Sequence, residues 1–216
     1  MIKDLEQRII YENENVLVVN KPYNLPSTGR SLDDDDCLQF WLIKRHGGMV
    51  WAIHQLDADT SGVNIFVTEK KLVSIYKKSL EKMNANKEYL VIVHGVPDWN
   101  ECEEFGPIGK IDDHSLGIHP EGKSAHSKFT VIKRGENHTF LKAQIFTGRT
   151  HQIRIHLSHL GHPVVGDDWY CKPPCQEHIR QALHCHKIHL LSSNELFTAP
   201  LPLDLEELIV KFNINE

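Results

Sequence analysis

Apolar and polar residues follow one another along this 216-residue chain in runs typical of short strands and helices. Runs that alternate or are rich in β-branched residues predict strands, namely Arg8–Tyr11, Val16–Asn20, Gly62–Thr68, Lys87–His94, Ser127–Lys133, Thr139–Phe146 and Ala182–Leu191. Apolar residues three or four apart predict helices, namely Cys37–Arg45, Lys70–Met83, Thr150–Leu160 and Leu205–Phe212. Most of these strands succeed one another without a crossover helix, which favours an α+β fold with a mixed, largely antiparallel sheet and flanking helices.

Glycine and proline mark the ends of two of the predicted helices. Gly47 and Gly48 stop the first, and Gly161 followed by Pro163 stops the third. The acidic run Asp33–Asp36 is expected to form a solvated loop or a helix N-terminus. No linker or repeat separates these elements, so we expect residues 1–216 to form a single domain.

Composition excludes several classes of protein. The chain lacks a run of 18 apolar residues and an apolar segment near Met1, so neither a membrane span nor a secretory signal is expected. Its five cysteines are odd in number and irregularly spaced. That pattern argues against a disulfide framework and favours a reducing compartment, which we take to be the cytoplasm.

The formal net charge of −5 argues weakly against nucleic-acid binding, but the charges are unevenly distributed. Lys123–Leu157 holds seven Lys or Arg residues and one acid, and Glu69–Glu88 holds six lysines and three acids. The acids concentrate in Asp33–Asp36, in Asp98–Asp113 and near the C-terminus. We therefore expect a positive face for a polyanion, the alternative being a mixed solvated surface.

A polar loop, His54–Gly62, separates two apolar segments and carries the carboxylates Asp57 and Asp59. Loops on a rigid scaffold often bear catalytic side chains. The alternative interpretation is an Asp-rich turn in which a carboxylate accepts backbone N–H bonds.

A second polar segment, Thr147–Leu157, places a glycine and two hydroxyl residues before a predicted helix. The first-turn N–H groups, together with Arg149, predict an anion site. Arg154 flanks the apolar stripe formed by Ile153, Leu157 and Leu160, so it needs a carboxylate partner if it is buried. Otherwise it is an exposed surface arginine.

Eight of the 15 histidines lie between His151 and His189. Together with Cys171 and Cys175, either His184 or His186 could complete a zinc site, but the spacing matches no regular paired motif. His151, His156 and His159 are better explained as polar helix edges that contact backbone or RNA phosphate. We therefore expect no metal.

Taken together, these segments resemble the RluA-type pseudouridine synthase family. The resemblance rests on motifs in the family's order along nearly the whole chain, namely Val18–Pro22, His54–Asp57 with Thr60–Gly62, Lys87–Tyr89, Thr147–Arg154, Gly161–Pro163 with Gly166–Asp167, and Ala182–His184. It implies a cofactor-free isomerisation of uridine to pseudouridine in RNA, on an α+β catalytic domain without the N-terminal RNA-binding extension of some members. The expected partner is therefore ribosomal or transfer RNA, with no membrane, no obligatory protein partner and a monomeric state.

The resemblance also implies residue roles. Asp57 would be the catalytic carboxylate, Tyr89 would lie against the uracil, and Arg154 would pair with Asp57. The residues expected to bind RNA are His54, Gln55, Thr60, Arg149, His151 and Gln152.

Physical chemistry fits these roles. An ionised Asp57 could attack as a nucleophile or abstract a ribose proton. A nearby Arg154 would stabilise the charge by about 4 kcal/mol before desolvation, at ~4 Å and an effective dielectric of ~20. A stacked base must be flipped out to react, and Tyr89 offers it a flat partner.

One departure leaves alternatives open. Many family members carry arginine where this chain has Gln55, which lacks a charge and a guanidinium plane. An altered RNA preference or weaker binding is the interpretation that keeps catalysis. A catalytically impaired RNA-binding protein and a zinc-dependent hydrolase are the competing hypotheses.

Overall fold

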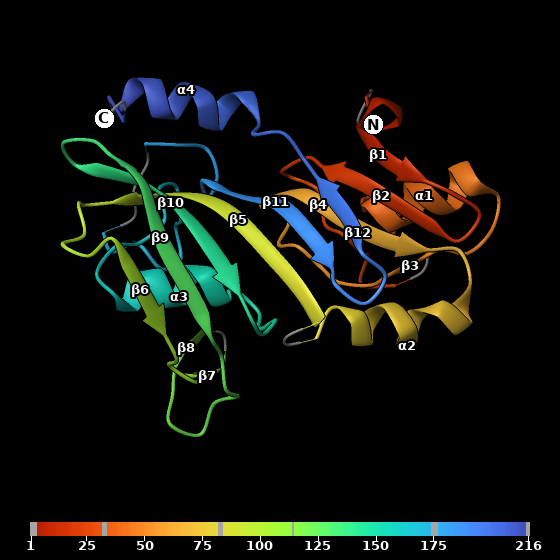
Figure 1. The fold of residues 1–216 in the computed structure, drawn as a ribbon, viewed down its shortest axis with the longest axis horizontal. Coiled ribbons are helices and arrows are strands. Elements are labelled where there is room, and N and C mark those ends of the chain that lie inside the picture. Colours follow the sequence, from red (N-terminus) through yellow and green to blue (C-terminus); the bar gives the residue numbers. More distant parts are fainter. Residues whose placement is uncertain (1–3, 32–33, 82–83, 114, 174–176, 215–216) are drawn as a thin grey trace. The chain divides into compact units, whose positions relative to one another are not determined.

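The computed structural model describes residues 4–31, 34–81, 84–113, 115–173 and 177–214 (Figure 1). Proximity of Cα atoms divides the chain into two compact units. The first unit comprises Met1–Ala85 and Cys185–Pro200, and the second comprises Asn86–His184 and Leu201–Glu216. Each unit is thus built from two separate stretches of sequence, and the expectation of one domain stays a prediction.

The strands of the first unit follow the order β1–β2–β4–β11, with β3 paired to β4 and β12 paired to β11. Their bounds are β1 (Ile9–Glu12), β2 (Val16–Lys21), β3 (Trp51–Ala52), β4 (Ser61–Val67), β11 (Leu183–Leu190) and β12 (Glu195–Thr198). Every residue of β4 is buried, as expected for a continuous apolar run. Gly62 has φ +112°, and a Cβ there would fall on the carbonyl of Cys185 in β11. Only glycine fits this position.

The helices of the first unit are the short 3-10 turn η1 (Glu6–Arg8), α1 (Leu38–His46) and α2 (Lys70–Ser79). Cys37 caps α1, because its Sγ accepts a 3.4 Å hydrogen bond from the N–H of Phe40. Gly47, at φ +74°, ends the helix. α1 packs its apolar side chains onto the first unit's core, which includes Leu17, Val19, Leu38, Leu42, Val50 and Phe66.

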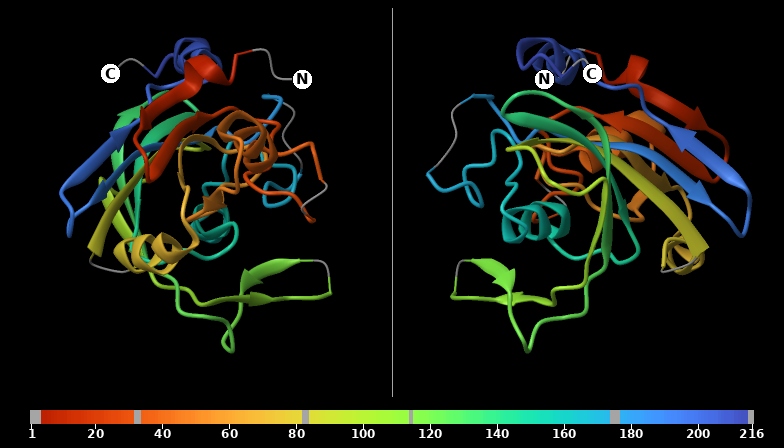
Figure 2. Two further views of the ribbon diagram at one scale, coloured as in Figure 1. Left: turned by 90° about the vertical axis from the view of Figure 1, so that its right-hand side faces the viewer. Right: turned by 60° about the vertical axis from the view of Figure 1, so that its left-hand side comes forward.

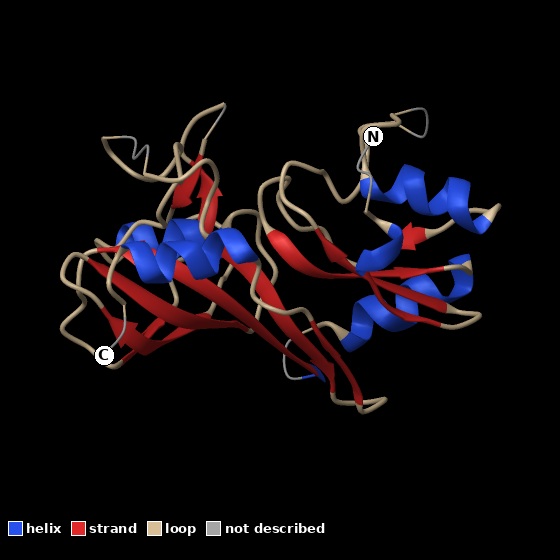
Figure 3. Ribbon diagram, turned by 90° about the horizontal axis from the view of Figure 1, so that it is seen from above, coloured by secondary structure: helices blue, strands red, loops and turns tan. Residues whose placement is uncertain are grey.

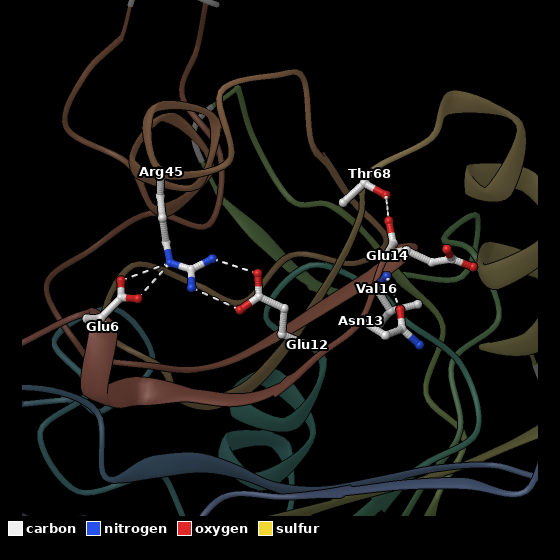
Figure 4. Close-up of polar contacts among 7 residues, drawn as sticks. All are labelled: Glu6, Glu12, Asn13, Glu14, Val16, Arg45 and Thr68. Carbon is white, nitrogen blue, oxygen red and sulfur yellow. Dashed lines mark hydrogen bonds and ion pairs between the residues drawn. The ribbon is translucent and has the colours of Figure 1, made fainter.

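At the surface of the same unit, Arg45 of α1 binds two carboxylates at once (Figure 4). Its Nε lies 2.8 Å from Oε2 of Glu6, and its Nη1 lies 2.7 Å from Oε1 of Glu12. The hydrogen bond from Arg45 holds the pKa of Glu12 below its usual range. These contacts tie α1 to η1 and β1.

The larger strands of the second unit follow the order β5–β10–β9–β6. Their bounds are β5 (Ala85–His94), β6 (Glu101–Glu104), β9 (Ser127–Arg134) and β10 (His138–Ile145). A separate hairpin, β7 (Ile108–Lys110) and β8 (Leu116–Ile118), extends away from these strands (Figure 2). The helices are α3 (Gln152–His159) and α4 (Leu203–Lys211), and α4 lies along this unit near the C-terminus (Figure 3).

Helix α3 differs from its predicted pattern. All residues from Gln152 to Leu157 are buried, so the apolar stripe is not the helix's only inward face. The helix contacts both β8 and β9. Ile155 joins a small apolar cluster with Ile108 and Ala125, which gives the opposite side of the helix its own core.

The α+β class and the mixed, largely antiparallel strands are confirmed. Predicted elements match observed ones to within two residues at either end, except that helix Lys70–Met83 already ends at Ser79. Met83 and Asp33 lie outside the described residues, and Asp34–Asp36 precede α1 without being helical. The strands that the sequence did not predict, β3, β6, β7, β8 and β12, have two to four residues each, too few to show an alternation. Over the described residues, no helix has the length and apolarity needed to cross a membrane.

Candidate active site

Asp57 lies in the first unit, on the loop between β3 and β4. Its carbonyl accepts a 3.0 Å hydrogen bond from the N–H of Thr60, which closes a tight turn. The Asp57 side chain is neither fully buried nor fully exposed. The loop therefore contains a turn closed by main-chain atoms, and it presents a half-buried carboxylate, while the alternative in which a carboxylate accepts backbone N–H bonds stays a prediction.

Two buried polar side chains hold the residues on either side of Asp57. Ser27 Oγ accepts a 3.0 Å bond from the N–H of Leu56 and donates to its carbonyl at 3.2 Å. Lys21 Nζ donates to the carbonyl of Ala58 at 2.9 Å. The loop around Asp57 is thus held in part through its main chain.

Lys21 is fully buried, which is rare for a lysine. Its ammonium also donates to the carbonyls of Pro22 at 2.9 Å and Leu25 at 2.7 Å. An ammonium carries three donors, and three carbonyl oxygens receive them here. This arrangement offsets the cost of burying the charge. The Lys-Pro pair is part of a sequence motif, but the sequence predicted no role for Lys21.

The other predicted residues of this loop differ in exposure. Gln55 is exposed and donates from Nε2 to Thr28 Oγ1 at 2.8 Å. His54 is half-buried, and its Nε2 accepts a 3.3 Å bond from the N–H of Ile65. Thr60 is 2% exposed. Of the three, Gln55 offers the most accessible surface for a ligand.

Arg154 lies in the second unit, buried in α3, and it has a carboxylate partner there. Its Nε and Nη2 donate to Asp167 Oδ2 and Oδ1 at 2.6 and 2.9 Å, a bidentate pair. The two residues are 5% and 1% exposed. The interpretation of Arg154 as an exposed surface arginine is wrong, and its pairing with Asp57 stays a prediction.

Aromatic rings complete the surroundings of this guanidinium. It lies 5.7 Å from the ring centroid of Trp169 and 5.1 Å from that of Tyr170. Asp167 Oδ1 also accepts bonds from the N–H groups of both residues, at 3.0 and 3.2 Å. Asp167 therefore fixes the arginine and the aromatic segment together. Asp167 is part of the Gly-Asp motif of the sequence, which did not predict that it anchors Arg154 and the aromatic segment.

The N-terminal end of α3 is occupied by side chains of its own unit. Gln152 is 3% exposed, and its Oε1 accepts bonds from Thr147 Oγ1 at 2.7 Å and from Arg149 N at 3.1 Å. Arg149 donates from Nε to the carbonyl of Ser124 at 3.0 Å. His151 has φ +56° and contacts the hydroxyl of Tyr170 at 2.9 Å. The anion site expected here and the RNA contacts of these residues stay predictions.

Tyr89, the third residue expected in the reaction, lies on β5 opposite Ala143 of β10. It is 7% exposed. The alternation of β5 turns it inward with Val91 and Val93, as the sequence predicted.

The expected positive face requires a correction. The acidic strand β6 pairs directly with the basic strand β9, so Lys128 Nζ lies 3.0 Å from Oε2 of Glu101. Arg154 is buried with Asp167. Acids that lie apart from the basic segment in the sequence therefore neutralise part of it in space.

The structure also places one of the helix histidines. His156 is fully buried and contacts Ser127 Oγ and the carbonyl of Gly106, each at 3.0 Å, so of its two expected partners it contacts the backbone and not RNA phosphate. Burial lowers its pKa. Among the described residues, the one group of three metal-ligand side chains is His94, His138 and Glu177. The zinc site considered from the sequence combined Cys171 and Cys175 with His184 or His186, and no observation tests it. Cys175 lies outside the described residues.

Comparison with known proteins decides the family. The family model described as RNA pseudouridylate synthase matches residues 15–159. The Bacillus subtilis (strain 168) protein named uncharacterized RNA pseudouridine synthase YjbO is 35% identical over 212 residues, covering 93% of this chain and 75% of the relative. The chain belongs to the RluA-type RNA pseudouridine synthase family. It is therefore an isomerase of the pseudouridine synthase class.

Other synthases of the family support this assignment. The dual-specificity RNA pseudouridine synthase RluA of Vibrio cholerae serotype O1 is 34% identical over 173 residues, covering 78% of this chain and 70% of the relative. The solved structure of human RNA pseudouridylate synthase domain containing 4 has a TM-score of 0.83 and 22% identity, covering 99% of this chain and 96% of that chain. It shows the same fold.

Proposed function

We propose that this synthase converts specific uridines in structured ribosomal or transfer RNA into pseudouridine, with Asp57 as the catalytic carboxylate. The observation that supports this role of Asp57 is that Lys21 and Ser27 form hydrogen bonds with main-chain atoms of the residues on either side of it. A carboxylate on a loop fixed in this way keeps its position while its side chain reacts. The names of relatives, among them a dual-specificity synthase and large-subunit ribosomal synthases, support the choice of RNA.

The reaction is an isomerisation, so atoms and electrons balance within the nucleotide. The C1′–N1 bond breaks, a C1′–C5 bond forms, and the proton on C5 moves to N1. Asp57 serves either as a nucleophile or as the base that removes a ribose proton, and both roles require the ionised carboxylate. Arg154 is the proposed cation that favours that form. Its rigid pairing with Asp167 supports this role, because the guanidinium has a fixed orientation.

The target base leaves its stack before it reacts, at a cost of a few kcal/mol. Tyr89 is the proposed flat partner for the flipped ring. His54, Gln55, Thr60, Arg149, His151 and Gln152 are the proposed RNA contacts, with Gln55 the most exposed of the loop residues. Because Thr60 and Gln152 are buried, we assign them to shaping the site around the RNA.

We further propose that the synthase acts as a monomer in the cytoplasm without an obligatory protein partner. Cys37 and Cys102 are free thiols, which fits a reducing compartment.

The test is Asp57→Asn, assayed by a chemical label selective for pseudouridine, since substrate and product have the same mass. We expect a loss of product of at least 1,000-fold, on the scale of removing a group that acts directly in the chemistry. The melting temperature should stay unchanged, because the clamps act on main-chain atoms. Asp98→Asn, at an exposed carboxylate, is the matched control.

Full conversion by the Asp57→Asn variant would overturn the assignment. A wild-type protein that binds total transfer and ribosomal RNA but forms no pseudouridine would favour the RNA-binding alternative instead.

A further inference from the structure

A group of metal-binding side chains lies outside every residue assigned to catalysis. His94 is the last residue of β5 and His138 the first of β10, and the two stand opposite each other in the antiparallel register. Glu177 comes from the segment between α3 and β11. One ligand atom of each residue lies within 4.8 Å of the corresponding atoms of the other two.

Each of the two imidazole rings has a buried nitrogen atom that lacks a hydrogen-bond partner among the described residues. Nε2 of His94 and Nε2 of His138 are buried and accept or donate no hydrogen bond among the described residues. Buried polar atoms in native proteins nearly always have a partner, so an unsatisfied pair in one place needs a cause.

The carboxylate is already close. Glu177 Oε2 lies 2.9 Å from His138 Nε2, within ion-pair distance, but this contact lacks the geometry of a hydrogen bond. Its side chain is 45% exposed, whereas that of His138 is 11% exposed. The group is therefore buried on the imidazole side and open to solvent on the carboxylate side.

The rings are held by their surroundings. The ring of Phe212, at the end of α4, stacks on His138 with centroids 3.7 Å apart and planes inclined by 11°. The other charged group nearby is the ammonium of Lys211, which donates to the main-chain carbonyl of Glu177 at 3.2 Å. The neighbouring His178 is engaged by Asp204 at 3.2 Å.

We propose that His94, His138 and Glu177 form a binding site for a divalent transition-metal cation of the zinc class. Two imidazole nitrogens and one carboxylate oxygen are a ligand set that suits Zn²⁺, with water in the open fourth position. Imidazole ligands select against Mg²⁺ and Ca²⁺, which prefer oxygen. With bonds of about 2.1 Å, tetrahedral ligands lie roughly 3.4 Å apart, so movements on the order of 1 Å close the site.

A bound cation satisfies both of these nitrogen atoms and ties the β5–β10 pair to the segment between α3 and β11. The role is structural, because the site contains none of the proposed catalytic residues. Failure of this proposal would therefore leave the proposed function untouched.

The test uses the full chain, stripped of metal by a chelator and titrated with ZnCl₂ in a calorimeter. We expect one high-affinity site and a melting temperature raised by about 5 °C at a Zn²⁺ concentration 100 times the Kd. Co²⁺ in place of Zn²⁺ should give visible absorption without a thiolate charge-transfer band, which distinguishes this site from one built on Cys171.

Glu177→Gln is the decisive variant, since the exposed side chain can change without unfolding the protein. We expect it, like His138→Gln, to weaken Zn²⁺ binding by on the order of 100-fold. His46→Gln, at an exposed histidine of α1, is the matched control and should bind as the wild type does. Equal affinity of wild type and Glu177→Gln, a thiolate band with Co²⁺, or no binding by the wild type would each overturn the proposal.

Discussion

The loop that carries Asp57 and the helix that carries Arg154 are held in place by different kinds of contact. In the first unit, Lys21 and Ser27 bind main-chain atoms next to Asp57, so these contacts do not depend on the side chain at position 57. In the second unit, Arg154 itself is the anchored group, through Asp167. Activity and stability are therefore separable at Asp57 and coupled at Arg154.

The same contrast extends to the charged networks of the two units. The Arg45 network of the first unit is solvent-exposed on the carboxylate side, with Glu6 and Glu12 side chains 65% and 38% exposed. In the second unit, by contrast, the side chains of Arg154 and Asp167 are only 6% and 0% exposed. Buried pairs are costly to break, whereas exposed ones contribute little.

Breaking the pair in the second unit should have the largest effect. We expect Asp167→Asn and Arg154→Met each to lower the free energy of unfolding by about 4 kcal/mol, because each leaves a buried group without its partner. The double variant should lose less than the sum of the two, as measured by urea denaturation. Additive losses would show that the two side chains are held independently.

Removing the main-chain clamp should come next. Lys21→Met removes the ammonium donor from the carbonyls of Pro22, Leu25 and Ala58, of which Ala58 keeps a 3.2 Å bond from the N–H of Leu25, and we expect a loss of about 3 kcal/mol in unfolding free energy. Pseudouridine formation should fall as well, since the Asp57 loop loses its anchor. Lys71→Met, at an exposed lysine of α2, is the control. A stable, fully active Lys21→Met protein would contradict the role of the clamp.

A pH series tests whether side-chain anchoring is general in the second unit. Burial raises the pKa of Asp204, but hydrogen bonds from His178 and Arg180 outweigh this and hold it well below the ordinary value of 3.8. A carboxylate with a lowered folded-state pKa stabilises the protein above its unfolded pKa and loses that contribution as the pH falls. Asp204→Asn should therefore cost about 2 kcal/mol at pH 7. This cost should shrink below about pH 4, whereas an unchanged cost down to pH 3 would contradict the pairing.

The exposed network of the first unit should matter least. We expect Arg45→Met to change the free energy of unfolding by less than about 1 kcal/mol at low salt, because its partners are solvated. The effect should shrink further at ~1 M salt, where the Debye length is about 3 Å. A larger and salt-independent loss would remove the contrast between the two units.

The sequence predicted the long elements and the Asp57 loop because their signals are local. Apolar runs such as Val63–Val67 mark buried strands, and a polar segment between two such runs marks a loop. The burial of Lys21 could not be predicted, since lysine is mostly exposed and its three acceptors are brought together only by the fold.

Long-range pairing accounts for the remaining differences. The sequence predicted that a buried Arg154 needs a carboxylate partner, and the structure shows one in Asp167, 13 residues further on, while the pairing with Asp57 stays a prediction. The local charge of Lys123–Leu157 was summed along the sequence, whereas Lys128 pairs with Glu101 across two neighbouring strands. The sum therefore could not include this pairing. The sequence did not predict the second buried side of α3 for the same reason. The β7–β8 hairpin covers a side of the helix that lies opposite the predicted apolar stripe.

The division of the chain between the units also bears on how the protein emerges from a ribosome. The first unit needs Cys185–Pro200, which contributes β12 and most of β11, and the second needs Leu201–Glu216, which contributes α4. Neither unit can be completed while the N-terminal half alone has been synthesised, although domains usually fold in the order of their synthesis. The nascent chain must keep the apolar residues of β2 and β4 from aggregating until residue 200 is available. We therefore expect both units to acquire their final packing only after residues 185–216 have been synthesised.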